Sequence, residues 1–124
     1  MKILLAEDDA SMRRFLEIIL QRADYEVVSA EDGLAAMKIA LAEKFDAVVA
    51  DAMMPNLTGH DLCRMLRQNF DYKNTPLIIL SGLEQEVSAS VEQNCADVYL
   101  VKGVNLKEDL TDHLARSIAE KAAL

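Results

Sequence analysis

The fold is decided by the stretch at residues 47–59, which reads AVVADAMMPNLTG. Its first four residues are small and aliphatic, as in a strand that is buried on both faces. A single acid, Asp51, follows at once, and Pro55 and Gly59 are typical of a turn that leads into a helix. The stretch therefore predicts a buried strand that carries a carboxylate at its carboxyl end and is followed by a helix.

The rest of the chain repeats this order of short apolar runs and amphipathic stretches. Compact aliphatic runs predict further strands at residues 3–6, 27–30, 77–80 and 98–101. Weaker helical patterns cover about 33–42, 58–68 and 84–94. Two stronger apolar stripes at helical spacing consist of Met12, Phe15, Leu16 and Ile19, and of Leu106, Leu110, Leu114 and Ile118. Because strand–helix–strand crossovers are short and right-handed, this alternation predicts a single α/β domain over residues 1–124, a parallel sheet with helices on both faces.

Composition excludes several classes of function. The 124 residues carry a formal charge of −8. This charge argues against a primary role in binding nucleic acid or an anionic membrane, because a protein binds either of them through a basic face. The apolar run at residues 3–6 is far too short for a signal peptide or a membrane span. The two cysteines, Cys63 and Cys95, lie far apart without a Cys-x-x-Cys pair, and we expect reduced, packed thiols in a cytoplasmic protein.

Polar residues gather where the predicted strands end. The first strand is followed by Glu7, Asp8 and Asp9, the third by Asp51, the fourth by Ser81 and the fifth by Lys102. In an open α/β sheet the ligand crevice lies outside the carboxyl ends of the strands. We therefore expect these side chains to meet at one edge of the sheet.

The charges at this edge indicate a chemistry. Three converging carboxylates, from Glu7, Asp8 and Asp51, repel one another and favour a divalent cation, and oxygen ligands with open positions suit Mg²⁺. An aspartate beside Mg²⁺, the Lys102 ammonium and the Ser81 hydroxyl is a candidate nucleophile toward phosphorus. The alternative is a set of solvated strand-end acids that Lys102 merely neutralises, since structural ion networks resemble active sites.

Over essentially its whole length the sequence resembles the receiver domain of two-component response regulators. The motifs that carry the resemblance are EDD at residues 7–9, DAMMPNLTG at 51–59, SG at 81–82 and YLVK at 99–102. The resemblance implies a flavodoxin-like, doubly wound sheet of five parallel strands in the order 2-1-3-4-5, with five helices. It also implies a cytoplasmic signalling protein rather than an enzyme acting on other molecules.

The resemblance assigns roles to individual residues. Asp51 is the expected phosphoacceptor, and Asp8 the direct Mg²⁺ ligand, with Glu7 acting through water. The backbone carbonyl of Met53 is the remaining expected protein ligand, and Asp9 is expected to face solvent or cap the first helix. Lys102 and Ser81 are expected to contact the phosphoryl oxygens.

The resemblance also implies partners and a switch. A histidine kinase or a histidine phosphotransfer protein donates the phosphoryl group. The Ser81 hydroxyl then moves inward and the Tyr99 ring turns toward the vacated space. This change remodels the surface formed by residues 84–94, 98–101 and the last helix, which contacts a downstream protein. Receiver domains often form homodimers through the same surface, and the sequence leaves the oligomeric state open. For Tyr99, ordinary edge packing is the alternative.

One departure from the family pattern keeps a rival function open. The family commonly has a proline with a cis peptide bond after the active-site lysine, whereas this chain has Gly103. A cis bond without proline costs about 2.5–4 kcal/mol, so we expect a trans bond and a more mobile loop. The rival is a receiver-like interaction module that is no longer phosphorylated.

Two other classes fit less well. A Mg²⁺-dependent phosphatase of the haloacid dehalogenase type places a second aspartate two residues after the nucleophile, where this chain has Met53. A flavodoxin-type binder needs a Ser/Thr/Gly-rich phosphate cradle where this chain has three acids.

Overall fold

The computed structural model describes residues 1–82 and 95–123. Its elements run β1 (Lys2–Ala6), α1 (Ala10–Arg22), β2 (Glu26–Ala30), α2 (Gly33–Ala42), β3 (Ala47–Asp51), α3 (Gly59–Arg67), the short 3₁₀ helix η1 (Phe70–Tyr72), β4 (Leu77–Ser81), β5 (Val98–Val101) and α5 (Leu106–Ala122). The predicted strands are confirmed to within one residue. The remaining predicted helix, which is the fourth in chain order and covers residues 84–94, lies outside the described residues.

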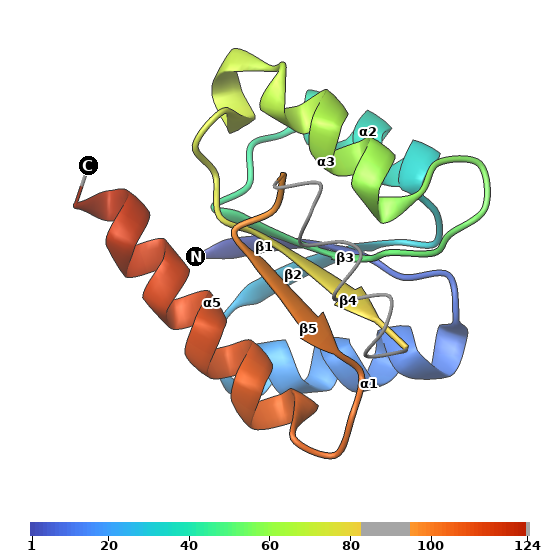
Figure 1. Ribbon diagram of the computed structural model, residues 1–124, viewed down its shortest axis with the longest axis vertical. Helices are drawn as coiled ribbons and strands as arrows, with labels where there is room; N and C mark the ends of the chain where they lie inside the picture. Colours follow the sequence, from blue (N-terminus) through green and yellow to red (C-terminus); the bar gives the residue numbers. More distant parts are fainter. Residues whose placement is uncertain (83–94, 124) are drawn as a thin grey trace.

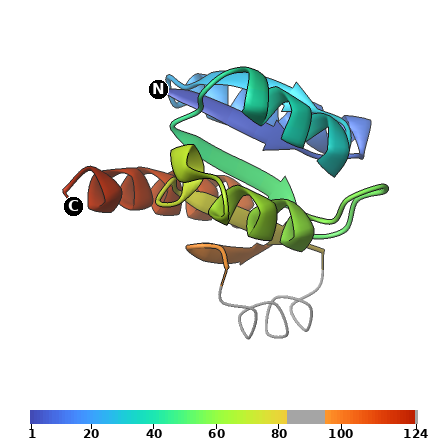
Figure 2. The same ribbon diagram turned by 90° about the horizontal axis from the view of Figure 1, so that it is seen from above.

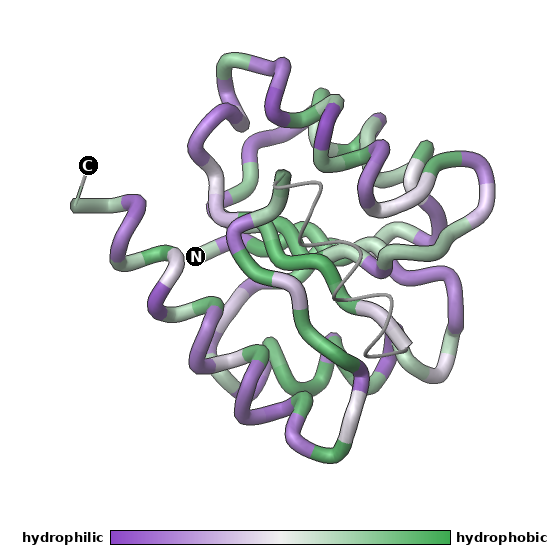
Figure 3. The backbone as a smooth tube through the Cα atoms, in the orientation of Figure 1, coloured by the Kyte–Doolittle hydropathy of each residue, from purple (hydrophilic) through white to green (hydrophobic). Residues whose placement is uncertain are grey.

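The five strands form one parallel sheet in the order β2-β1-β3-β4-β5, which confirms the predicted doubly wound architecture. Helices α2 and α3 cover one face of this sheet, and α1 and α5 cover the other (Figures 1 and 2). The central strands are mostly hydrophobic, whereas hydrophilic residues are frequent along the helices (Figure 3). Side chains alternate between the two faces of a strand, so each face has its own apolar core.

The two amphipathic stripes were predicted with one error. In α5, Leu106, Leu110 and Leu114 are buried against the sheet, as expected. In α1, Leu16 and Ile19 are buried, but Phe15 remains 46% exposed. Leu20, one turn beyond Leu16, is fully buried in the core that α1 shares with the sheet. The buried face of α1 is therefore rotated slightly from the predicted one.

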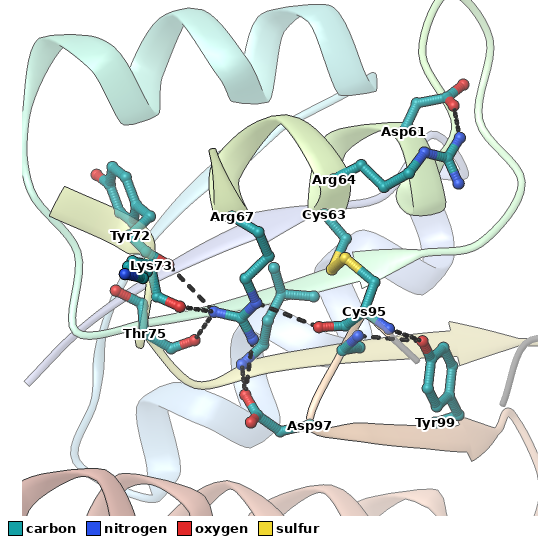
Figure 4. Close-up of a disulfide and its surroundings, with 12 residues drawn as sticks. Asp61, Cys63, Arg64, Arg67, Tyr72, Lys73, Thr75, Cys95, Asp97 and Tyr99 are labelled. Atoms are coloured by element: carbon teal, nitrogen blue, oxygen red, sulfur yellow. Dashed lines mark hydrogen bonds and ion pairs between the residues drawn. A yellow bond between two sulfur atoms is a disulfide. The ribbon is translucent and has the colours of Figure 1, made fainter. Parts of the chain in front are cut away.

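The expectation of two reduced thiols is wrong in this structure. Cys63, in α3, and Cys95, just before β5, form a disulfide with their Cα atoms 6.2 Å apart, and neither cysteine is free. The two residues are 32 positions apart in sequence, and the parallel topology brings α3 beside the segment that enters β5 (Figure 4). The expectation of reduced thiols rested on the cysteine spacing and on a cytoplasmic location. Neither indicates that α3 and the segment before β5 lie side by side.

Two glycines allow helices to approach the loop after β3 closely. A Cβ atom on Gly59 would overlap the carbonyl oxygen of Asp51. It would also lie 2.9 Å from the carbonyl carbon of Asp51 and 3.1 Å from the Cα of Ala52. A Cβ atom on Gly33 would lie 2.7 Å from the Cβ of Leu57 and even closer to its carbonyl oxygen. The first turns of α2 and α3 thus pack directly on the backbone around Asp51, and they hold this loop in place.

Among the described residues, no helix is both long enough and apolar enough to cross a membrane.

We predict that Gly59→Ala destabilises the protein by about 1–3 kcal/mol, because the added methyl group must displace the Asp51 backbone. Urea denaturation gives the change in the free energy of unfolding. The matched control is Gly103→Ala, since the nearest atom that the structure describes there is 4.0 Å away. Equal effects of the two substitutions would contradict the close-packing argument.

Candidate functional site

The strand register brings the predicted site residues to one edge of the sheet. Ala6 of β1 lies beside Ala50 of β3, so that Glu7 follows next to Asp51. Asp51 pairs in turn with Leu80, one residue before Ser81, and Ser81 pairs with Val101, one residue before Lys102. The N–H of Lys102 donates to the carbonyl of Ser81 at 2.7 Å. Three neighbouring strand pairs therefore place the four predicted site residues in sequence along this edge.

Lys102 connects the two buried acids of the site. Its Nζ lies 2.9 Å from Oε2 of Glu7 and 3.0 Å from Oδ2 of Asp51. Glu7 is fully buried and Asp51 is nearly so, at 7% exposure. Burial of a charged carboxylate costs free energy because the group loses its hydration. The ammonium group between these two buried carboxylates offsets part of that cost for both.

A third carboxylate, that of Asp8, completes an acidic cluster. One oxygen from each of Glu7, Asp8 and Asp51 lies within 4.8 Å of the others, and Asp8 is the exposed member. An oxygen cluster of this size suits a hard divalent cation, and the exposed Asp8 leaves room for water ligands. The three residues fit the Mg²⁺ site that the sequence predicts.

Burial and neighbouring charges shift the pKa values of Glu7 and Lys102. Burial raises the pKa of Glu7, Lys102 lowers it and the negative charge of Asp51 raises it again, giving a value of about 7 against an ordinary 4.5. Burial lowers the pKa of Lys102, but its contacts with Glu7 and Asp51 outweigh burial and leave that pKa raised. Lys102 is therefore a permanent cation at neutral pH, whereas Glu7 exchanges its proton there.

Local hydrogen bonds fix the loop after β1. Oε1 of Glu7 accepts the N–H of Asp9 at 3.2 Å, and the guanidinium of Arg13 donates to the Glu7 carbonyl at 2.9 Å. The Asp9 side chain accepts the N–H of Met12 at 2.7 Å and caps α1, as one of its two expected roles requires. Arg13 was not anticipated from the sequence, where it is simply a cation on a predicted helix.

The loop after β3 is held from two sides. The N–H of Met53 donates to Oδ1 of Asp51 over a long 3.4 Å, and the Met53 side chain is 63% exposed. The side-chain amide of Asn56 donates to Asp32, the residue that caps α2, at 3.1 Å. Thr58 caps α3. These contacts orient the loop, while the expected role of the Met53 carbonyl as a metal ligand stays a prediction.

Ser81 and Tyr99, the predicted switch residues, occupy different surroundings. Ser81 is the last residue of β4 and is buried. The Tyr99 hydroxyl accepts the N–H groups of Cys95 and Ala96, both at 3.0 Å. Its ring stacks beside that of His60 in α3, with centroids 6.3 Å apart. The sequence assigned no role to His60, and its burial lowers its pKa.

The peptide bond between Lys102 and Gly103 is trans, since the described chain contains no cis peptide bond. This confirms the expectation from the sequence. The N–H of Gly103 donates to the carbonyl of Val101 at 2.9 Å, and its own carbonyl accepts the N–H of Leu106 at 3.1 Å. Greater mobility of this loop stays a prediction.

Comparison with known proteins gives consistent matches. The response regulator ArlR of Staphylococcus saprophyticus is 34% identical over 109 residues, which cover 86% of this chain and 48% of that protein. The chain thus spans about half the length of the curated relatives it matches.

Among solved structures, the receiver domain of sensor histidine kinase PA1611 from Pseudomonas aeruginosa has a TM-score of 0.87 and 27% identity, covering 95% of this chain and 97% of that one. That structure has a magnesium ion coordinated in its active site cleft. The response regulator TrrA of Thermotoga maritima, in complex with Mg²⁺-BeF, has a TM-score of 0.84 and 28% identity, covering 94% of this chain and 97% of that one.

A family comparison covers nearly the whole chain. The pattern described as the response regulator receiver domain matches residues 3–115, a range that includes every residue of the acidic cluster as well as Ser81, Tyr99 and Lys102. With the sheet order and the arrangement of strand-end side chains, this match shows that the chain belongs to the response regulator receiver domain family.

Proposed function

We propose that this chain is a phosphorylation-activated signalling switch that accepts a phosphoryl group on Asp51 in a Mg²⁺-dependent reaction. The observation that carries the proposal is the contact of a single ammonium group, on Lys102, with Asp51 at 3.0 Å and with Glu7 at 2.9 Å, beside a cluster of three carboxylates. Asp51 is the last residue of β3, the middle strand of the sheet, and its carboxylate contacts the Lys102 ammonium. This is the position that a nucleophile toward a phosphoryl group requires.

The donor is a phosphohistidine of a histidine kinase or of a phosphotransfer protein. An oxygen of Asp51 forms a bond to phosphorus while the bond from phosphorus to the donor nitrogen breaks, and the leaving imidazole takes up a proton. Lys102 and the Ser81 hydroxyl contact the phosphoryl oxygens and stabilise the negative charge on them. Asp8 and Asp51 hold Mg²⁺, with Glu7 acting through water and the Met53 carbonyl as a further ligand. The bound ion supplies additional charge neutralisation on the same oxygens.

The signal leaves through Tyr99. Its hydroxyl accepts two backbone N–H groups from the segment that enters β5, so a change of the ring position alters both the segment and the neighbouring surface of β5 and α5. We propose that Ser81, drawn toward the phosphoryl group, makes room for this change. A local gain of charge thereby biases a two-state element.

The setting follows from this role. We propose that residues 1–124 form one receiver domain that works in the cytoplasm, with a histidine kinase or phosphotransfer protein upstream and another protein downstream. The surface that includes β5 and α5 is the one through which a homodimer would form. The domain catalyses only its own phosphorylation and dephosphorylation. The formal charge of −8 supports a protein rather than a nucleic acid as the direct target.

Phosphorylation is tested with a small donor. Incubation with acetyl phosphate and Mg²⁺ is expected to add one phosphoryl group to the wild type, as read by intact mass, and none to Asp51→Asn. The matched control is Asp112→Asn, which makes the same change at an exposed carboxylate on α5 and is expected to leave the adduct intact. If neither acetyl phosphate nor a kinase labels the wild type, the non-phosphorylated interaction module becomes the better explanation.

Mg²⁺ binding is tested by calorimetry. We expect Asp8→Ala to weaken the affinity by at least about tenfold, or 1.4 kcal/mol, because it removes a carboxylate ligand. Asp9→Ala is the neighbouring control: it removes a helix cap and an equal charge but no ligand, and it is expected to change the affinity much less. Unchanged affinity in Asp8→Ala would refute the metal assignment.

The raised pKa of Glu7 predicts a pH dependence of the same binding. Since that pKa is about 7, the side chain is increasingly neutral as the pH falls from 8 to 6, and a neutral carboxyl attracts a cation less. We expect Mg²⁺ affinity to fall over this range by up to about tenfold per pH unit. In Glu7→Gln this part of the pH dependence is expected to vanish, and a slope identical to that of the wild type would assign the titration to another group.

A further inference from the structure

The disulfide between Cys63 and Cys95 lies next to the predicted switch residue. Cys63 is fully buried in α3, whereas Cys95 is partly exposed in the segment before β5. The backbone N–H of Cys95 donates to the Tyr99 hydroxyl at 3.0 Å (Figure 4). A covalent bond to α3 therefore fixes one of the two N–H groups that hold the ring of Tyr99.

The other donor is fixed by the same segment. The N–H of Ala96 also donates to the Tyr99 hydroxyl, again at 3.0 Å. The ring stacks beside that of His60, three residues before Cys63 in α3. Helix α3 thus reaches Tyr99 in two ways. Its His60 ring contacts the Tyr99 ring directly, and its Cys63 is joined by the disulfide to Cys95, whose N–H binds the Tyr99 hydroxyl.

A second link between α3 and this segment does not involve sulfur. The guanidinium of Arg67 donates to the carbonyl of Cys95 at 3.2 Å and forms an ion pair with Asp97 at 3.0 Å. Lys121 of α5 also pairs with Asp97, at 3.1 Å. Because neither of these links involves sulfur, we expect the fold to remain intact on reduction, while Cys95 loses its covalent restraint.

We propose that Cys63 and Cys95 form a reversible redox site whose oxidised form fixes the position of Tyr99 and whose reduced form releases it. Disulfides in cytoplasmic proteins are usually transient or redox-sensing rather than permanent. The effect on signalling rests on the function and cytoplasmic location proposed above. The redox chemistry and its effect on Tyr99 do not depend on phosphorylation.

The reaction partner is a low-molecular-weight disulfide such as oxidised glutathione. The thiolate of Cys95, the partly exposed residue, attacks one sulfur of this disulfide and releases one glutathione thiol. The thiolate of Cys63 then attacks the Cys95 sulfur of the mixed disulfide and releases the second. The two cysteine thiols together lose two electrons and two protons, and two glutathione thiols gain them. A dithiol reductant runs the exchange in reverse, beginning at Cys95.

The redox site is tested by counting thiols. The folded protein is equilibrated in buffers of reduced and oxidised glutathione and quenched with acid, and only then unfolded for alkylation with N-ethylmaleimide, because Cys63 is fully buried. Since the chain has only two cysteines, intact mass reports both directly. We expect a transition from two labels to none within the glutathione series, without denaturant. Two labels in every buffer, or a disulfide that is reduced only after unfolding, would overturn the proposal.

The effect on Tyr99 is tested by fluorine NMR of protein that carries 3-fluorotyrosine. The chain has three tyrosines, and the resonance of Tyr99 is identified by its loss in Tyr99→Phe. On reduction we expect this resonance to shift by more than its linewidth. The resonance of Tyr25, which packs against the core on the other face of the sheet, is expected to stay in place.

Cysteine variants distinguish a disulfide that fixes the position of Tyr99 from one that only stabilises the fold. Cys63→Ala/Cys95→Ala is expected to show the reduced Tyr99 resonance in every redox buffer. Cys95→Ser, which alters only the partly exposed position, serves the same purpose if the double variant does not fold. A Tyr99 resonance that is the same in oxidised, reduced and variant proteins would refute the proposal that the disulfide fixes the position of Tyr99. No phosphodonor is present in these experiments, so their failure is distinct from a failure of phosphorylation at Asp51.

Discussion

Two buried carboxylates share one ammonium group, and the rest of the site depends on this arrangement. Lys102 reaches Glu7 and Asp51 from the last strand of the sheet, so the acids are neutralised only if β1, β3 and β5 keep their relative positions. Loss of one partner from a buried ion pair typically costs about 3–5 kcal/mol. With Asp8 included, however, three carboxylates cluster beside one ammonium group among the residues that the structure describes. The excess negative charge favours a metal ion at this site, and burial, together with the charge of Asp51, keeps the pKa of Glu7 at about 7.

The backbone around Asp51 is held as firmly as its side chain. Gly33 and Gly59 let α2 and α3 pack against the loop after β3 at distances that no Cβ atom would allow. Asn56 bonds to the residue that caps α2, and Thr58 caps α3. In the proposed reaction Asp51 meets a phosphoryl group at a defined angle, and a loop with little freedom of its own favours that geometry.

Sequence reasoning recovered the sheet because its strands are short, apolar and buried on both faces, and these properties are local. It recovered the side chains at the strand ends for a related reason: parallel strands bring their carboxyl ends to one edge, whatever the helices do. It misjudged Phe15 because four residues at helical spacing define a stripe without fixing how the helix is rotated against the sheet.

Sequence reasoning did not find the disulfide or the contact between His60 and Tyr99, and the reason is different. Both depend on where α3 lies relative to the segment before β5, which is a property of the packed chain and has no periodic signal. The same is true of Gly59, where a residue typical of a turn also proved necessary for a close helix contact.

Arg67 shows how such packing is made tolerant of sequence change. Its guanidinium donates to the main-chain carbonyls of Tyr72, Lys73, Thr75 and Cys95, and Asp97 is its only side-chain partner among the described residues (Figure 4). Carbonyl oxygens are present whatever the side chain, so the arginine recognises the path of the connection between α3 and β4 rather than its composition. A substitution at an exposed position on this connection, such as Lys73, therefore leaves in place the carbonyl oxygen that Arg67 binds.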